Sequence, residues 1–98
     1  MNDFGVNPSG NEGELRQAIG RWTAGHANSE ITDQAVYDAE LARLQRADAA
    51  ARDANRPVAR TELDVFITDV MAAQPATVAA KLATDVLAFA AAPVERLK

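Results

Sequence analysis

The stretch AAQPATVAAKLATDVLAFAAAP, residues 72–93, decides the fold of this chain. Fifteen of its twenty-two residues are hydrophobic, and ten of those are alanine, the residue with the highest helix propensity. The larger apolar residues recur at helical spacing, which predicts a helix over 76–91 that Pro93 ends. Pro75 fits the first turn of this helix, where a missing N–H costs nothing, or else it kinks one longer helix.

This predicted helix carries too much charge to cross a membrane. Lys81 and Asp85 lie near its middle, where each costs about 2.5–3.5 kcal/mol on insertion scales. The large apolar residues on the opposite face are Val78, Leu82, Val86 and Phe89. Because short neighbouring helices cover such a broad apolar arc poorly, we expect part of it to bind a second chain. The alternative is that this helix is the centre of a monomeric bundle.

Length and composition allow one small domain. The chain has 98 residues, and of its hydrophobic residues 22 are alanine and only 25 are larger. The core is therefore small, and the protein is expected to be modestly stable alone or to be completed by a partner. The absence of cysteine excludes disulfides and thiolate metal sites and is compatible with a cytoplasmic location. The first residues lack the pattern of a secretory signal, and we expect a flexible arm over 1–11.

The remaining segments also show helical periodicity. The single domain over 12–98 is expected to contain helices at about 12–24, 33–55, 62–73 and 76–91. No segment alternates with a period of two over a useful length. The predicted fold class is therefore all-α, a small bundle of three or four helices.

Local signals set these helix boundaries. Gly25 is expected to be the left-handed residue that ends the first helix. Thr32 is the expected N-cap of the second helix, and Pro57 is expected to stop that helix near residue 55. Thr61 is expected to cap the third helix.

Charge is unevenly distributed along the chain. The net charge is −4, which argues against general nucleic-acid binding, yet residues 43–60 are net positive. The candidate binding arginines there are Arg43, Arg46, Arg52 and Arg56. They form either a solvated face with local pairs, such as Asp48 with Arg52, or an anion-facing surface for an acidic partner or for the acidic ends of a second copy.

The residues that most often carry chemistry do not form a catalytic or metal-binding pattern. His26 is the single histidine, so a zinc site would need carboxylates alone to complete it, and we expect a capping or solvent-facing role instead. Acidic pairs such as Asp38 and Glu40 lie two residues apart and face in different directions on a helix. We therefore expect no enzymatic activity, no cofactor and no bound metal.

The segment LRQAIGRWTAGHANSEITDQAVYDAELARLQ resembles short helical-hairpin oligomerisation modules of the SHOCT type. The residues that carry the resemblance are Leu15, Ile19, Trp22, Gly25, Ile31, Thr32, Asp33, Tyr37, Leu41 and Leu44. It covers a third of the chain and implies a helical hairpin that self-associates. Here the loop after Gly25 is several residues longer than in those modules, and the aromatic residue is displaced. The same stretch is also similar to a helix start in the adenylation region of NAD-dependent DNA ligases, with Tyr37 one residue late.

Taken together, these features predict a small non-catalytic module that binds another protein. We expect a homo-oligomer, with a dimer favoured, and no membrane association. The alternative function is an acidic inhibitor or decoy, such as a phage-type anti-defence protein, that blocks a nucleic-acid-binding complex of the host through its carboxylates. A third possibility, an enzyme or ligand-binding domain, requires a ligand that stabilises the fold.

Overall fold

The computed structural model describes residues 11–96, which form four α-helices. Their bounds are α1 (Asn11–Ala27), α2 (Gln34–Arg52), α3 (Arg56–Ala73) and α4 (Ala80–Arg96). The predicted all-α class is confirmed. The predicted N-terminal arm lies outside the described residues, except for Asn11, which begins α1.

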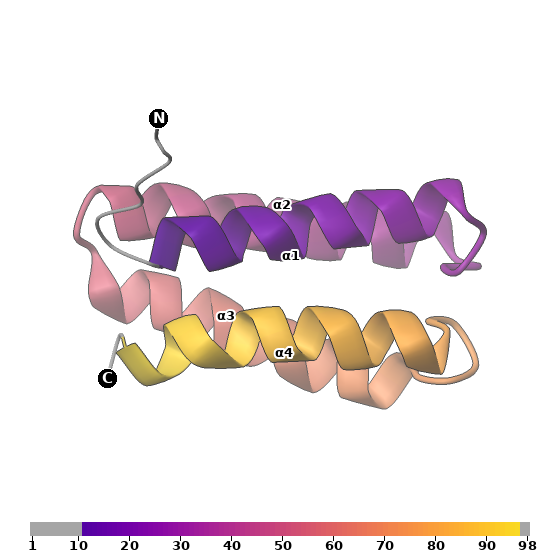
Figure 1. Cartoon of the computed structure of the whole chain (residues 1–98). Helices are drawn as coiled ribbons and strands as arrows, with labels where there is room; N and C mark the ends of the chain where they lie inside the picture. The colour runs from indigo at the N-terminus through magenta and orange to yellow at the C-terminus, as the bar shows by residue number, and fades with distance from the viewer. Residues whose placement is uncertain (1–10, 97–98) are drawn as a thin grey trace.

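The helices form an antiparallel four-helix bundle (Figure 1). Each helix reverses the direction of the one before it, and α4 returns to lie beside α1. In the view of Figure 1, α1 and α4 lie in front and α2 and α3 lie behind them. Each helix therefore contacts two neighbours and turns one apolar face toward a shared core.

Trp22 occupies the centre of this core. Its side chain is fully buried and meets the ring of Phe66 edge to face, with 5.5 Å between the ring centroids. The indole Nε1–H donates a hydrogen bond to the main-chain oxygen of Tyr37 at 3.2 Å. Because its polar atom is satisfied, the largest side chain of the protein joins α1 to both α2 and α3 without a desolvation penalty.

Two loops are joined at one end of the bundle. Ile31, between α1 and α2, and Val78, between α3 and α4, form an isolated antiparallel β-bridge. The Thr32 N–H donates to the Thr77 oxygen at 2.9 Å, and the Ala79 N–H donates to the Glu30 oxygen at 2.8 Å. We call these residues, 30–32 and 77–79, the loop clasp. It holds the start of α4 against the end of α1.

Gly25 lies next to this clasp, at a close contact between α1 and α4. A Cβ atom at Gly25 would stand 2.5 Å from Cδ2 of Leu82, which is fully buried. The expectation that Gly25 ends α1 is therefore wrong, because this glycine makes room for α4 and the helix continues to Ala27. The left-handed residue is instead Ser29, with φ 63°, and the following Glu30 N–H bonds to the Gly25 oxygen.

The other predicted boundaries shift by several residues. Asp33, not Thr32, caps α2, because its carboxylate accepts hydrogen bonds from the N–H groups of Ala35 and Val36. The helix ends at Arg52, before a left-handed Ala54 with φ 58°.

Both later helices begin or end away from their predicted bounds. The predicted start of α3 at 62 is wrong, because Pro57 lies in the first turn of a helix that begins at Arg56 and contains Thr61. The predicted start of α4 at 76 is also wrong, because the chain forms the loop clasp before entering the helix at Ala80. Pro93 does not stop α4; its ring is fully buried inside the helix, so packing offsets the missing N–H.

The two glycines in the middle and last part of α1 give a matched test of the close approach. We expect Gly25→Ala to lower the free energy of unfolding by about 1–3 kcal/mol, because the added methyl group overpacks against Leu82. Gly20→Ala, in open space on the same helix, should raise it by about 0.5–1 kcal/mol through helix propensity. Urea denaturation measures both, and equal stabilisation by the two substitutions would contradict the packing role of Gly25.

Candidate functional site

The apolar residues predicted to bind a partner belong to the protein's own core. Val78, Leu82 and Val86 are each 0% exposed, and Phe89 is partly buried against the same cluster. The prediction that this face is available to a second chain is therefore wrong for the first three residues. The apolar face of α4 is covered more completely than predicted. Alanines and Gly25 let α1 and α3 approach α4 closely enough to enclose this face.

The four candidate arginines do not form one surface. Arg43 and Arg46 both turn toward α3, where they contact the carboxylate of Glu62 at 3.1 and 3.2 Å. Arg52 pairs with Asp48 at 2.9 Å, so the predicted i, i+4 pair is confirmed. Arg56 is exposed at the start of α3.

A buried carboxyl group lies at the seam between α2 and α3. Glu40 is only 5% exposed, and one of its oxygens lies 3.4 Å from Nε of Arg43 without forming a hydrogen bond. Arg43 Nε also lies 3.8 Å from the carboxylate of Asp69 on α3. Burial, together with the neighbouring Asp69, raises the pKa of Glu40 to about 8. Glu40 therefore retains its proton at neutral pH.

The proximity of Glu40 and Asp69 was not predicted from the sequence, because the two acids lie on different helices and local spacing relates only residues of one helix. The available signal was the position of Glu40, one turn before Leu44 on the inward stripe of α2. A glutamate there must be neutralised or paired by another helix. The carboxyl group of Glu40 is therefore enclosed by its own bundle.

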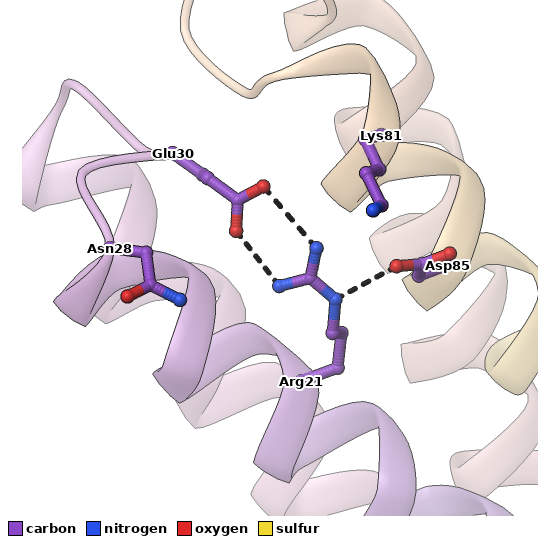
Figure 2. A pocket seen from close by; sticks show the side chains of 5 residues that line it. All are labelled: Arg21, Asn28, Glu30, Lys81 and Asp85. Carbon is purple, nitrogen blue, oxygen red and sulfur yellow. Dashed lines mark hydrogen bonds and ion pairs between the residues drawn. The ribbon is translucent and has the colours of Figure 1, made fainter.

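A second ionic cluster lies between α1, the loop clasp and α4 (Figure 2). Arg21 contacts both carboxylate oxygens of Glu30, at 2.8 and 3.3 Å, and its Nε donates to Asp85 at 2.8 Å. With Asn28 and Lys81, these residues line an open depression of about 490 Å³. The hydrogen bonds from Arg21 lower the pKa of Glu30, and the two acids raise the pKa of Arg21. The guanidinium thus binds two carboxylates of its own chain and joins elements that are distant in the sequence. We call Arg21, Glu30 and Asp85 the Arg21 clamp.

His26 has a more structured environment than predicted. Its ring stacks on Tyr37, with 3.9 Å between centroids, and its Nε2 lies 2.9 Å from Oε1 of Gln34. The amide of Gln34 donates to Asp38 at 3.0 Å, which leaves its oxygen as the acceptor toward the histidine. Nε2 of His26 therefore carries the proton, and the ring supports the α1–α2 junction.

Within the part of the chain that the structure describes, no three His, Asp or Glu side chains are grouped to hold a metal ion. None of the described helices is long and apolar enough to cross a membrane. Comparison of the chain with protein-family models, curated proteins and solved structures finds no match. The similarity to SHOCT-type modules therefore remains a similarity of short sequence patterns.

The elevated pKa of Glu40 predicts a pH-dependent stability. The pKa of this glutamate is about 4.5 in the unfolded chain and about 8 in the folded protein. Between these two pH values the folded protein holds a proton that the unfolded chain releases. The free energy of unfolding therefore falls as pH rises from 4.5 to 8. The slope from this one proton is at most about 1.4 kcal/mol per pH unit. Glu40→Gln should remove this component in urea denaturation measured across the window.

Asp69→Asn provides the matched control for that measurement. It removes the neighbouring acid but leaves Glu40 buried, so the fall in stability should become smaller without disappearing. An unchanged pH profile in Glu40→Gln would show that Glu40 is not the group that retains the proton.

The Arg21 clamp predicts a difference between arginine and lysine at this position. Arg21→Lys keeps the charge but loses the planar fork that contacts Glu30 and Asp85 together, so the melting temperature should fall by a few degrees. Arg16→Lys, on the exposed side of the same helix, should leave it unchanged. Thermal unfolding of both variants, followed by circular dichroism, tests this; equal effects would contradict the clamp.

Proposed function

We propose that the protein is a non-catalytic helical interaction module that associates with a second copy of itself through the outward surface of α4. This surface lies opposite the apolar face that the sequence pointed to. Because the large residues of α4 fill the protein's own core, an interface on this helix must use the residues that face away from Leu82 and Val86.

The observation that carries this proposal is the chemistry of that outward surface. Its exposed residues between Lys81 and Glu95 are Thr84, Ala88 and Ala91. They recur at intervals of four and three residues, so they follow one line along the helix. Exposed protein surface is usually about 25–35% charged, whereas this line has no charge for about two turns. Small uncharged residues at helical spacing favour close packing of another helix.

Apolar residues on α3 extend the same surface. Met71 is 57% exposed, more than any other large hydrophobic residue among those described, and Ile67 on the same helix is partly buried. Helical geometry places both on the side of α3 that adjoins α4, and places Leu87 on the facing side of α4. A second copy packed on α4 would remove part of this apolar area from water.

The ionisable groups support a binding role rather than catalysis. Glu40 is enclosed between α2 and α3, and Arg21 and Glu30 are paired with each other. The pKa of each of these three groups departs clearly from its ordinary value, and each group is engaged in an internal contact. Arg21 and Glu30 do line the open depression, but their charges are paired with each other there, and Glu40 is enclosed; this favours a structural role for all three over acid–base chemistry.

The proposal predicts a concentration-dependent mass. We expect the wild type to exceed the monomer mass in light scattering at high concentration, and Ala88→Asp to return it to the monomer by placing a charge in the contact. Ala49→Asp makes the same change on the exposed side of α2 and should leave the mass of the wild type. A wild-type protein that remains monomeric at millimolar concentration would contradict self-association.

A further inference from the structure

We infer that the Arg43 side chain is a pH-sensitive switch at the seam between α2 and α3. It binds Glu62 of α3 while the Glu40 carboxyl group is neutral, and it turns to Glu40 of its own helix when that group becomes charged. The inference rests on the arrangement of the side chains at this seam and does not depend on self-association.

Two buried polar atoms face each other at the seam without a hydrogen bond. Oε1 of Glu40 and Nε of Arg43 are both removed from water, and neither has a hydrogen-bond partner. The distance between them is 3.4 Å, longer than the roughly 2.7–2.9 Å of a charge-assisted hydrogen bond. Because unpaired buried donors and acceptors are costly, a short shift of the guanidinium toward Glu40 is favoured once this carboxyl group carries a charge.

In the present arrangement the guanidinium of Arg43 is held by a different acid. Its Nη1 donates a hydrogen bond to Oε1 of Glu62 at 3.1 Å. A guanidinium binds a carboxylate more strongly than a neutral carboxyl group. Arg43 therefore remains with Glu62 as long as Glu40 keeps its proton.

Glu62 has a second arginine, so Arg43 can leave it without stranding a charge. Nε of Arg46 donates to one carboxylate oxygen of Glu62 at 3.2 Å, and Nη2 donates to the other at 3.4 Å. The Glu62 carboxylate thus stays paired across the seam in both positions of Arg43. A buried, ionised Glu40, in contrast, needs the guanidinium beside it.

The groups around Glu40 determine when the switch occurs. Burial and the acid Asp69 of α3 raise the pKa of Glu40 to about 8, and Arg43 opposes that rise. On the side of α1, the titratable group at this part of α2 is His26, whose ring stacks on Tyr37. The change from one arrangement to the other is therefore expected near pH 8.

Asp69 gives the second arrangement a defined geometry. Nε of Arg43 lies 3.8 Å from the Asp69 carboxylate as well as 3.4 Å from Glu40. When Glu40 releases its proton to solvent, this guanidinium stands between two carboxylates and reduces their repulsion. The switch is thus a rearrangement within the folded protein, separate from the pH dependence of unfolding predicted above.

NMR titration of the full chain tests the link between the two groups. The Glu40 Cδ signal should titrate with a midpoint near 8, and the Arg43 Nε signal should shift with the same midpoint. In Glu40→Gln the Arg43 signal should stay near its wild-type position at neutral pH throughout the titration. An Arg43 signal that does not change while Glu40 titrates overturns the switch.

Crystal structures determined well below and well above pH 8 test the movement itself. Below this pH, Arg43 should contact Glu62 as it does here. Above it, Nε of Arg43 should lie within hydrogen-bond distance of Glu40, and Arg46 should remain on Glu62. An Arg43 side chain in the same position at both pH values overturns the proposal.

Two arginine variants provide a matched comparison in the same titration. Arg43→Gln should raise the Glu40 midpoint by about one pH unit or more, because it removes the cation that lies against this carboxyl group. Arg46→Gln makes the same change in the arginine that contacts Glu62 and should shift the midpoint much less. Circular dichroism checks that both are folded, and equal shifts would contradict the role of Arg43. If Arg43→Gln does not fold, the wild-type and Glu40→Gln titrations still decide the question.

Discussion

The close approach of α1 and α4 at Gly25 is the contact on which the rest of the bundle depends. Leu82 fills the space that a side chain at Gly25 would need, and the loop clasp fixes the two helices at the same end. Arg21 adds charged hydrogen bonds between α1, the clasp and α4. Because the first and last helices are joined in this way, each of the four helices contacts two neighbours. The modest number of large apolar residues is then enough to fill the core between them.

Charged side chains occupy the seams between helices. On one side Arg21 joins the clasp to α4, and on the other Arg43 and Arg46 share Glu62 across α2 and α3. The arginine-rich middle of the sequence is therefore distributed between internal ion pairs and solvent. Glu40 is the exception, since its carboxyl group is buried with an acid nearby and is neutralised by a proton rather than by a salt bridge of good geometry.

The two faces of α4 have separate uses in this description. Its large residues pack inside one chain, and its small outward residues form the surface that we propose for a second copy. A contact built on alanine and threonine buries little apolar area, so the association should be weak and reversible.

The sequence by itself determined the helical class, the approximate location of four helices and the pair between Asp48 and Arg52. These follow from local propensity and from spacing within one helix, which act over a few residues. Only the tertiary structure decided that Gly25 is a packing residue, that Pro57 and Pro93 lie inside helices and that Val78, Leu82 and Val86 are enclosed. It also brought Asp69 to Glu40 and Asp85 to Arg21. The reason is that coverage of a face and pairing of charges depend on which helices become neighbours, and that arrangement is set by contacts between segments far apart in the chain.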